Sequence, residues 1–424
     1  MQYLVVLVFL FALLYDYKRA VMLLVPLHLV FLMLVFPGTP FSNFDVVAAL
    51  VTFLAPFKLS QDEKALMKSY PFWFGSFLML FSIAGTSLLI EPHWPTALMT
   101  FNAYYIFPLI LWMCIETKEE LMFLLKVIAF FAIAMGLYCL FEMASASNPY
   151  IRYLISSGLG NVSVLDYDKF RFGIKRCQGF LSTPAPTGLF FGLILSSYYW
   201  IADKFSVDMK KALFLLFPLC AVGVLITGTR SVIAATCVAL IGVVAHEIIK
   251  PRYIFIKIVG VIVVLALSAS FLMEVVGSFI NTDQTAVSGS NTDMRQEQLL
   301  ISLFYWANSP IWGNGSGFIW HYVQEVDKGI YGAESIWFQI LVDFGAVGAF
   351  AYMACIFNAI VSLWKKHFVW VFLPLGFLVG KTLSTVIGIE MSVLFLFSII
   401  LLKYEILFNT KEDDIEDEQL EETP

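Results

Sequence analysis

The sequence predicts an all-α polytopic membrane protein with about 12–13 transmembrane helices. Of the 424 residues, 60% are hydrophobic and only 14% are charged, and the mean hydropathy is +0.82. Apolar runs of membrane-spanning length recur along the chain. Basic residues are concentrated in every second link between these runs. This alternation is expected when consecutive helices cross a membrane in opposite directions.

Thirteen apolar segments are candidates for these helices, and together they predict a single polytopic membrane domain over residues 1–410. The first segment has neither a basic n-region nor a small-residue cleavage site, so we expect a membrane helix there rather than a removable signal peptide. The segments lie near residues 2–15, 20–36, 44–57, 70–90, 94–115, 121–144, 185–202, 212–228, 231–249, 254–276, 335–363, 368–387 and 390–408.

The distribution of lysine and arginine predicts the sidedness of the links. Three links, "PGTPFSN", "EPHWP" and "VIGIE", contain no basic residue, so the positive-inside rule places them outside. The amino terminus is then outside as well. The links placed in the cytoplasm contain Lys18/Arg19, Lys58/Lys64/Lys68, Lys118, Lys204/Lys210/Lys211, Lys250/Arg252/Lys257 and Lys365/Lys366.

The carboxyl-terminal residues 411–424 contain eight acidic residues and one lysine. Their net charge of −7, within a total of −6, leaves +1 for the rest of the chain. Such a segment is typical of a disordered, solvated end. We therefore expect an acidic cytoplasmic tail without a catalytic role.

Two long loops, 145–184 and 277–334, both fall on the predicted outer side. Loops of this length in a compact membrane protein usually carry function. The first has a net charge of +3, whereas the second contains six acidic residues against Arg295 and Lys328. The sequence therefore predicts that the functional site lies at the outer face.

Arg230 interrupts the apolar stretch "AVGVLITGTRSVIAATCVALIGVV" (221–244) at the outer end of the turn between two helices. A guanidinium in a lipid-facing helix costs about 2.5–3.5 kcal/mol. At the start of a helix, Arg230 would add a full charge where backbone N–H groups already favour an anion. The alternative is an arginine that extends its head group to the interface, which is common near helix ends.

The segment "NTDMRQEQLLISLFYWANSPIWGNGSGFIWHYV" (291–323) predicts an amphipathic helix over about 292–308, followed by a glycine-rich turn. The helix would lie at the membrane surface with Leu299, Leu300, Leu303 and Phe304 turned inward. The amides of the "GNGSG" turn could approach a ligand closely. An ordinary helix and turn is the alternative. His321 is either a site residue or an interfacial packing residue beside Trp320 and Tyr322.

Glu334 stands at the mouth of the helix predicted over 335–363. Partial burial there would suit a general base. The alternative is a carboxylate that the N-terminal end of the helix dipole favours. Asp343, Lys381 and Glu390 are predicted intramembrane charges, and each needs a partner or a watery cavity.

The order of these motifs resembles that of the O-antigen ligase and O-antigen polymerase superfamily of bacterial envelope glycosyltransferases. The shared pattern comprises "GTRS" at a helix start, an arginine in a large outer loop, "SPIWGNGSG", and a polar pair before a helix with a GxxG step. The ligase branch has a histidine, then Asn, Ser or Gln, then nine residues, then GxxG. This chain has Glu334, Ser335, nine residues, then Gly345 and Gly348. The missing histidine favours a polymerase.

The resemblance implies a GT-C-like fold in the bacterial inner membrane, with an active site that faces the periplasm. It also implies an inverting, metal-independent transfer between undecaprenyl-diphosphate-linked glycans that needs no cofactor. Arg230 and Arg295 would bind the pyrophosphate of the donor through their planar guanidinium groups. Additional contacts would come from Arg171, Lys175 and Arg176. Glu334 would be the general base, with His321 as the alternative base.

We therefore expect a polymerase that joins lipid-linked repeat units into O-antigen, capsule or a related polysaccharide. The expected partners are the donor and acceptor glycans, membrane lipid and a protein that regulates chain length, and no nucleic acid. One alternative is a ligase that transfers glycan to the lipid A core of lipopolysaccharide. Another is a lipid-linked oligosaccharide flippase or transporter. We found no internal repeat, and both long loops lie on one side, which favours catalysis over transport.

Overall fold

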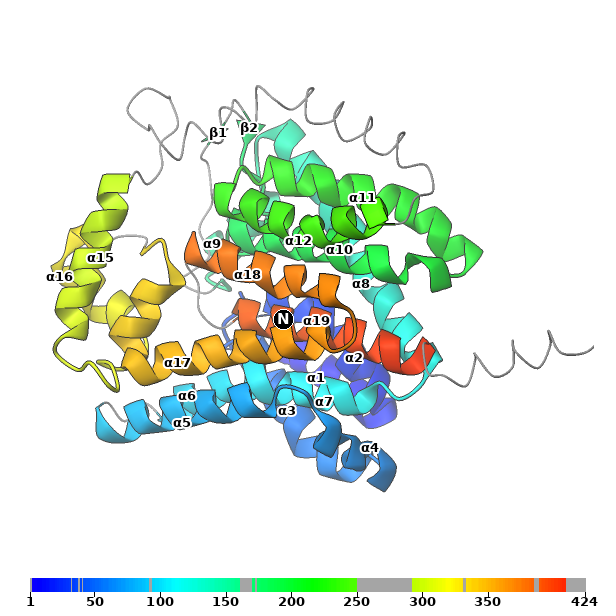
Figure 1. Ribbon diagram of the computed structural model, residues 1–424, viewed down its shortest axis with the longest axis horizontal. Helices are drawn as coiled ribbons and strands as arrows, with labels where there is room; N and C mark the ends of the chain where they lie inside the picture. Colours follow the sequence, from blue (N-terminus) through cyan, green and yellow to red (C-terminus); the bar gives the residue numbers. More distant parts are fainter. Residues whose placement is uncertain are drawn as a thin grey trace, which may run out of the picture.

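The computed structural model describes residues 2–31, 33–36, 39, 41–90, 94–160, 170–171, 174–249, 292–330, 333–384 and 389–408. Their regular structure is helical, apart from isolated bridges and a small antiparallel hairpin that places Phe170 opposite Lys175. The long helices lie side by side, and the helix labelled α15 crosses them at one end (Figure 1). This arrangement confirms the predicted all-α polytopic membrane class.

The first part of the chain forms helices joined by short turns. They are α1 (Gln2–Tyr15), α2 (Tyr17–Phe31), α3 (Asn43–Lys58), α4 (Gln61–Ala65), the 3₁₀-helix η1 (Leu66–Ser69), α5 (Trp73–Leu89), α6 (Trp94–Phe101), the π-helix η2 (Asn102–Ile106), α7 (Phe107–Cys114) and α8 (Lys118–Ser145). The next elements form the first long loop and the helices after it. They are α9 (Pro149–Ser156), β1 (Phe170–Arg171), β2 (Ile174–Lys175), α10 (Pro184–Ile201), η3 (Ala202–Lys204), α11 (Val207–Ile226) and α12 (Arg230–Ile249).

The last part of the chain forms the second long loop and the carboxyl-terminal helices. They are α15 (Thr292–Trp306), the π-helix η4 (Ile319–Val323), α16 (Gln324–Val326), η5 (Lys328–Ile330), α17 (Ile336–Trp364), η6 (Phe368–Val371), α18 (Phe372–Thr382) and α19 (Ile389–Phe408). Three helix starts follow from local sequence, because Ser42, Ser60 and Thr117 each form a capping box. The side chain of each accepts from the amide three residues later, and the carboxylate of that later residue accepts from the backbone N–H of the cap.

Twelve of the thirteen predicted apolar segments are helical over most of their length, and the segment 254–276 lies outside the described residues. The described residues contain five helices that are long and apolar enough to cross a membrane. The number is six if the helices Asn43–Lys58 and Gln61–Ser69, which meet at a sharp bend, together form one span. Four shorter apolar helices accompany them. The number of 12–13 crossings therefore stays a prediction. The predicted tail, 411–424, also lies outside the described residues.

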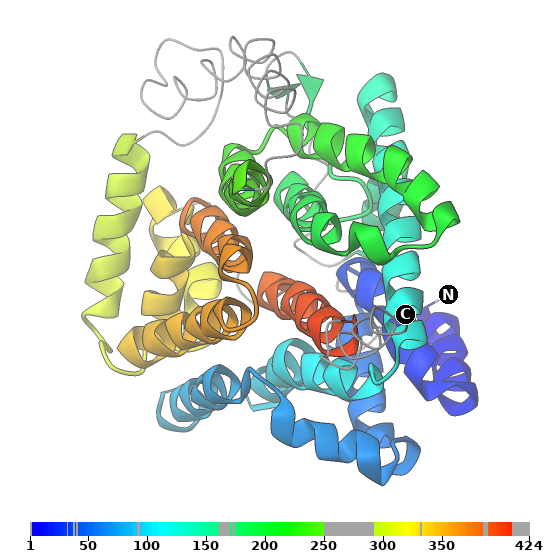
Figure 2. The same ribbon diagram turned by 45° about the vertical axis from the view of Figure 1, so that its right-hand side comes forward.

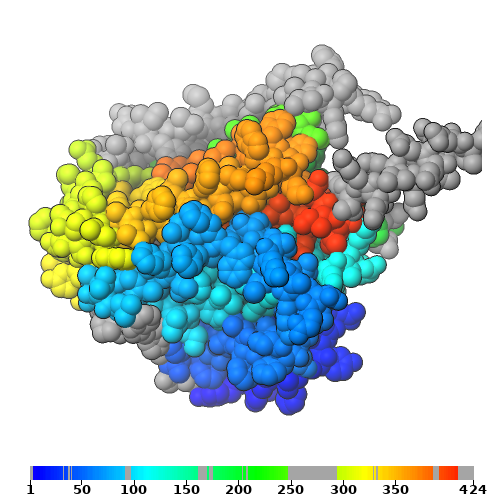
Figure 3. All heavy atoms as spheres, turned by 60° about the horizontal axis from the view of Figure 1, so that its bottom comes forward, coloured from blue at the N-terminus to red at the C-terminus, as the bar shows by residue number. Residues whose placement is uncertain are grey.

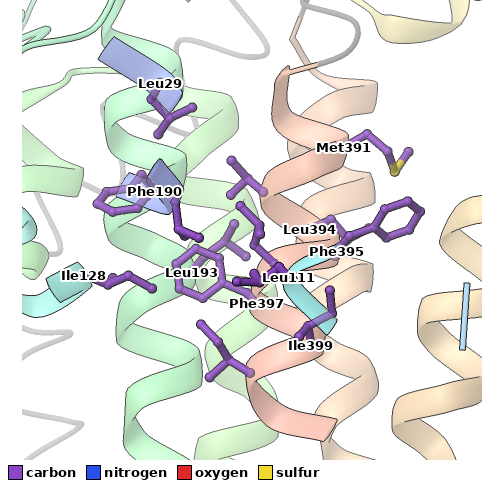
Figure 4. Close-up of a cluster of buried hydrophobic side chains, with 14 of the residues drawn as sticks. Leu29, Leu111, Ile128, Phe190, Leu193, Met391, Leu394, Phe395, Phe397 and Ile399 are labelled. Atoms are coloured by element: carbon purple, nitrogen blue, oxygen red, sulfur yellow. The ribbon is translucent and has the colours of Figure 1, made fainter. Parts of the chain in front are cut away.

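Helix α19 lies at the centre of the bundle (Figure 2). Every side chain from Met391 to Tyr404 is buried, as expected for a helix that other helices surround. Phe395 stacks on Phe72 with 4.6 Å between ring centroids, and Phe397 meets Phe190 edge to face (Figure 4). Because lipid is as apolar as these side chains, close packing rather than exclusion of water stabilises this core.

The outer surface of the bundle is rich in exposed apolar side chains. On α3 and α5, these include Phe53, Phe57, Phe74 and Phe77. Figure 3 shows the face on which the blue helices α3–α5 lie beside the orange α17. A surface of this kind suits contact with lipid chains rather than water.

One end of the bundle, which we call the lysine end, gathers residues that the positive-inside rule places together. Lys18 forms an ion pair with Glu63, with Glu116 at 3.7 Å and with Glu120 at 2.7 Å. The Lys118 ammonium lies 5.1 Å from the ring centroid of Phe408, so α19 ends here too. We call the opposite end, where α18 ends and α19 begins, the loop end.

Helix α17 is broken near the loop end. Gly345 has φ +64° and ψ −160°, which is not helical. The glycine-rich turn 309–317 bonds to both sides of the break. The amides of Asn314 and Gly315 donate to the carbonyls of Val342 and Asp343. In the other direction, the amides of residues 346 and 347 donate to the carbonyls of residues 310 and 311. Peptide groups at the break are therefore bonded within the protein, as a membrane requires.

Asp343 adds two bonds to these reciprocal hydrogen bonds between α17 and the turn 309–317, which we call the clamp. Its two carboxylate oxygens accept from the amides of Gly317 and Ile319 at 3.0 and 2.9 Å. Within the described residues, this predicted intramembrane charge is therefore bonded to the backbone amides of residues 317 and 319. Several amides of the "GNGSG" turn were predicted to approach a ligand. In the structure, the amides of residues 314, 315 and 317 donate to α17 instead.

We expect Lys18→Met to lower the free energy of unfolding by about 1–3 kcal/mol, because it leaves the buried Glu63 carboxylate without its ammonium partner. Thermal unfolding of the detergent-solubilised protein measures this effect. The exposed Lys68 is the control, and Lys68→Met should leave the midpoint unchanged. Equal midpoints for both variants would show that the Lys18 cluster does not stabilise the fold.

We expect Gly345→Ala to destabilise the protein by more than about 3 kcal/mol, through left-handed strain and overpacking. An added Cβ would lie 2.4 Å from the Ile311 carbonyl oxygen and 2.6 Å from the Gly313 nitrogen. Gly158 is the matched control, because it has φ +65° but open space around its Cβ position. If Gly345→Ala and Gly158→Ala unfold at similar temperatures, the clamp is not a strong constraint.

Candidate functional site

Arg295 and Glu334 meet at the loop end. Arg295 extends from α15, and its Nη2 donates to the Glu334 Oε2 at 3.1 Å. The same nitrogen donates to the carbonyl of Leu383, just after α18, at 3.1 Å. The two side chains remain 26% and 33% exposed. A cation and a carboxylate that the sequence places 39 residues apart therefore share one accessible position.

Gln298 belongs to the same cluster and was not predicted as a site residue. Its side-chain Oε1 accepts from the backbone N–H of Glu334 at 3.0 Å, and its side chain is buried. Glu334 directly precedes Ser335, the N-cap of α17, whose Oγ accepts from the Trp337 amide. The only local signal for Gln298 is its i, i+3 spacing from Arg295, which puts both on one face of α15.

The two faces of α15 differ in environment. Gln298 and Ser302 are buried toward the protein. Leu299, Leu300, Leu303 and Phe304 are 39–68% exposed. The polar face thus packs within the protein, and the apolar face is left for the membrane surface, where the sequence predicts it. Insertion of this face into lipid stays a prediction.

Arg230 is the first residue of α12 and is only 6% exposed. The turn that precedes it is held by Arg176. The Arg176 Nε donates to the carbonyl of Thr227 at 3.1 Å, and its Nη2 donates to the Thr229 Oγ1 at 2.9 Å. Gly228, with φ +57°, supplies the left-handed residue that the turn needs. Arg176 therefore fixes the backbone from which Arg230 extends.

Lys175, next to Arg176 in the sequence, forms a buried ion pair. Its Nζ is 3.7 Å from the Glu142 Oε1, and both side chains are fully buried. The second oxygen of Glu142 accepts from the amides of Gln178 and Gly179. Burial raises the pKa of the neighbouring Cys177 thiol to about 12, so this thiol is protonated at neutral pH. These contacts indicate a structural role for the segment 175–179.

The remaining predicted residues are separate from this cluster or outside the described part. The Arg171 backbone lies in β1, and its side chain is outside the described residues. His321 is exposed on η4, and its ring faces Gly317. In the described part of the chain, its side chain makes no hydrogen bond with Arg295 or Glu334.

The last turn of α18 joins the regions around the two arginines. A Cβ built on Gly380 would lie 3.7 Å from the carbonyl oxygen of Ser231, the residue after Arg230. One helical turn later, the carbonyl of Leu383 accepts from Arg295. One short helix end therefore contacts both the start of α12 and the guanidinium on α15.

This turn also contacts α17 and contributes a buried cation. The Trp337 indole N–H donates to the Thr382 Oγ1 at 3.1 Å. Lys381 is buried in the same turn, and its ammonium lies 5.9 Å from the ring centroid of Phe377. Glu390, the other predicted charge in this region, has a side chain outside the described residues. In the described part of the loop end, this turn thus adjoins α12, which begins at Arg230, bonds to Arg295, which holds the Glu334 carboxylate, and contributes Lys381.

Such a set of groups suits the binding of an anion beside a carboxylate. Two guanidinium groups can bind phosphate oxygens through directed N–H donors. Within the described residues, no three His, Cys, Asp or Glu side chains are close enough to hold a metal ion. Metal-independent chemistry stays a prediction.

We expect Arg176→Lys to lower the free energy of unfolding by about 1–3 kcal/mol, because lysine cannot reproduce the two directed bonds to the 227–229 turn. Thermal unfolding in detergent measures the effect. The exposed Arg19 at the lysine end is the control, and Arg19→Lys should be neutral. A neutral Arg176→Lys variant would contradict the role of Arg176 in fixing the turn.

Comparisons with known proteins bear on the same region. No curated protein matched the chain. Residues 214–353 match the family model described as O-antigen ligase. The matched residues include Arg230, Arg295 and Glu334. The chain therefore contains an O-antigen ligase-like domain over about a third of its length, which supports the predicted relationship to the O-antigen ligase and O-antigen polymerase superfamily.

Proposed function

We propose that the protein is a polymerase that joins undecaprenyl-diphosphate-linked oligosaccharide repeat units into O-antigen, capsule or a related polysaccharide. The reaction would take place at the periplasmic face of the inner membrane. The observation that carries the proposal is the pairing of Arg295 with Glu334, next to the helix end that also contacts the start of α12. This arrangement offers cations for a lipid diphosphate and a carboxylate for a sugar hydroxyl.

Electrostatics support the assignment of the donor diphosphate to Arg230 and Arg295. A diphosphate on a membrane-embedded polyprenol carries its charge at the membrane boundary, where a buried guanidinium is a strong counter-ion. The charge on the leaving diphosphate increases as its bond to the sugar breaks. Preorganised cations at that position therefore stabilise the transition state more than the ground state.

In the proposed transfer, the growing chain on its lipid diphosphate is the donor and a single lipid-linked repeat unit is the acceptor. The Glu334 carboxylate takes the proton of the acceptor hydroxyl. The hydroxyl oxygen forms a bond to the anomeric carbon from the face opposite the leaving group. The bond from that carbon to the diphosphate oxygen breaks, and its electron pair leaves with undecaprenyl diphosphate. The configuration at the anomeric carbon is thereby inverted.

The comparison with ligases rests on one position. Glu334 occupies the place where the ligase branch of the resemblance has histidine, which favours a polymerase. Ligation to lipid A core is the alternative within the same superfamily. Deletion and complementation in cells separate the two functions: loss of long chains with a surviving single capped unit indicates a polymerase. Loss of all capping indicates a ligase.

A flippase or transporter is the alternative outside this enzyme class, and the break in α17 bears on it. Transporters use the free peptide groups of broken helices to bind substrates or ions. Here, the carbonyls of residues 342 and 343 and the amides of residues 346 and 347 are bonded to the turn 309–317. This pairing favours a fixed scaffold. Joining of lipid-linked repeats by the purified protein in detergent would exclude a pure flippase, which needs two compartments.

We expect Arg230→Ala and Arg295→Ala each to lower polymerisation by about 10²–10³-fold, since each removes a cation from the leaving diphosphate. Glu334→Gln should lower it by about 10²–10⁴-fold through loss of the base. Gel analysis of chain lengths in complemented cells measures all three.

Arg19→Ala and Glu297→Gln are the controls for loss of charge, and both should keep wild-type chain lengths. Wild-type chains in the two site-arginine variants would refute the diphosphate assignment. If Glu334→Gln alone keeps full activity, only the assignment of Glu334 as the general base is refuted.

A further inference from the structure

The Glu334 carboxylate lies on the guanidinium to which the proposed function assigns the donor diphosphate. Both groups are anionic and both bind guanidinium through oxygen atoms, so they compete for the Arg295 N–H donors. The Arg295–Glu334 pair is partly exposed, and ion pairs of this kind are weak because water screens them. A diphosphate with several acceptor oxygens can therefore displace the single carboxylate oxygen.

The backbone around Glu334 is held separately from its carboxylate. The buried Gln298 accepts from the Glu334 amide, and Ser335 caps the helix that follows. Gln298 and Arg295 lie one turn apart on α15. The same helix therefore supplies the acceptor for the Glu334 backbone N–H and the guanidinium for the Glu334 carboxylate. The bond from the Glu334 amide to Gln298 does not involve the Arg295 guanidinium, so the backbone of Glu334 can stay bonded when its carboxylate leaves Arg295.

We propose that Gln298 is a positioning residue, which keeps Glu334 in place while the donor diphosphate replaces its carboxylate on Arg295. This inference rests on the proposed function and adds a sequence of events to it: the donor binds before the base becomes available. While Glu334 is bonded to Arg295, that carboxylate oxygen is engaged by a cation. Binding of the donor releases it for the acceptor hydroxyl, so the base becomes available only when a donor is bound. The Leu383 carbonyl holds Arg295 in the same position throughout.

The first experiment measures binding of undecaprenyl diphosphate to the full-length protein in nanodiscs, with undecaprenol as the probe that lacks the diphosphate. Glu334→Gln removes the competing charge and should tighten diphosphate binding about two- to fivefold, which corresponds to the weak pair it replaces. Arg295→Ala should weaken binding. Glu297→Gln, on the exposed side of the same helix, is the matched control and should bind as wild type does.

Three results would overturn this competition. If Glu334→Gln binds no more tightly than wild type, the carboxylate does not compete, although the proposed function stands. If Glu297→Gln tightens binding equally, the gain reflects overall charge. If wild type binds the diphosphate no better than undecaprenol, both the proposed function and this inference fail.

The second experiment tests Gln298 itself. Gln298→Met keeps the side-chain length but removes the acceptor oxygen, and it should lower the turnover of lipid-linked repeats by about tenfold through misplacement of the base. Its affinity for undecaprenyl diphosphate should stay within about twofold of wild type, because Arg295 is unchanged. Gln296→Met, at an exposed position of α15, should leave both quantities unchanged.

A positioning role predicts this separation of turnover from binding. Equal losses of turnover and affinity would show that Gln298 only stabilises the fold. Unchanged turnover would show that the backbone hydrogen bond to Glu334 is dispensable. Either result would overturn the assignment of Gln298.

Discussion

The reciprocal hydrogen bonds between the broken helix α17 and the turn 309–317 are the constraint on which the loop end depends. The lipid core does not tolerate unbonded peptide groups, so a helix can break there where another protein segment, or water in a cavity, supplies donors and acceptors. The turn supplies both, and Asp343 adds a carboxylate to its amides. This clamp fixes the turn 309–317, within the described part of the second long loop, against α17. The polar face of α15 can therefore reach the residues that begin α17.

The same principle accounts for the other charges in this region. Lys175 is paired with Glu142, Arg176 is bonded to the turn before α12, and Arg295 is bonded to Glu334 and to the end of α18. Lys175 and Arg176 are buried and have partners within the protein that fix the backbone. The Arg295–Glu334 pair is more exposed, and its two partners can separate at a low cost in free energy. This difference separates Lys175 and Arg176, which support the site, from Arg295 and Glu334, which we propose to take part in the reaction.

Much of the fold could be predicted from the sequence, because membrane helices depend on local composition. Twelve predicted segments are helical, and Lys18 meets carboxylates from links that were placed on its own side. The start of a helix at Arg230 also follows from local sequence. The partners could not be predicted in this way. The contacts of Gln298 with Glu334, and of Arg295 with Leu383, join residues 36 and 88 positions apart. No local pattern encodes such pairs.

The most direct test of the account is the location of a lipid-linked repeat unit bound to the protein in nanodiscs, determined by electron cryomicroscopy. We predict diphosphate density within hydrogen-bonding distance of the guanidinium groups of Arg230 and Arg295, with the Glu334 carboxylate turned away from Arg295. A head group bound elsewhere, or two arginines that open into separate cavities, would contradict it.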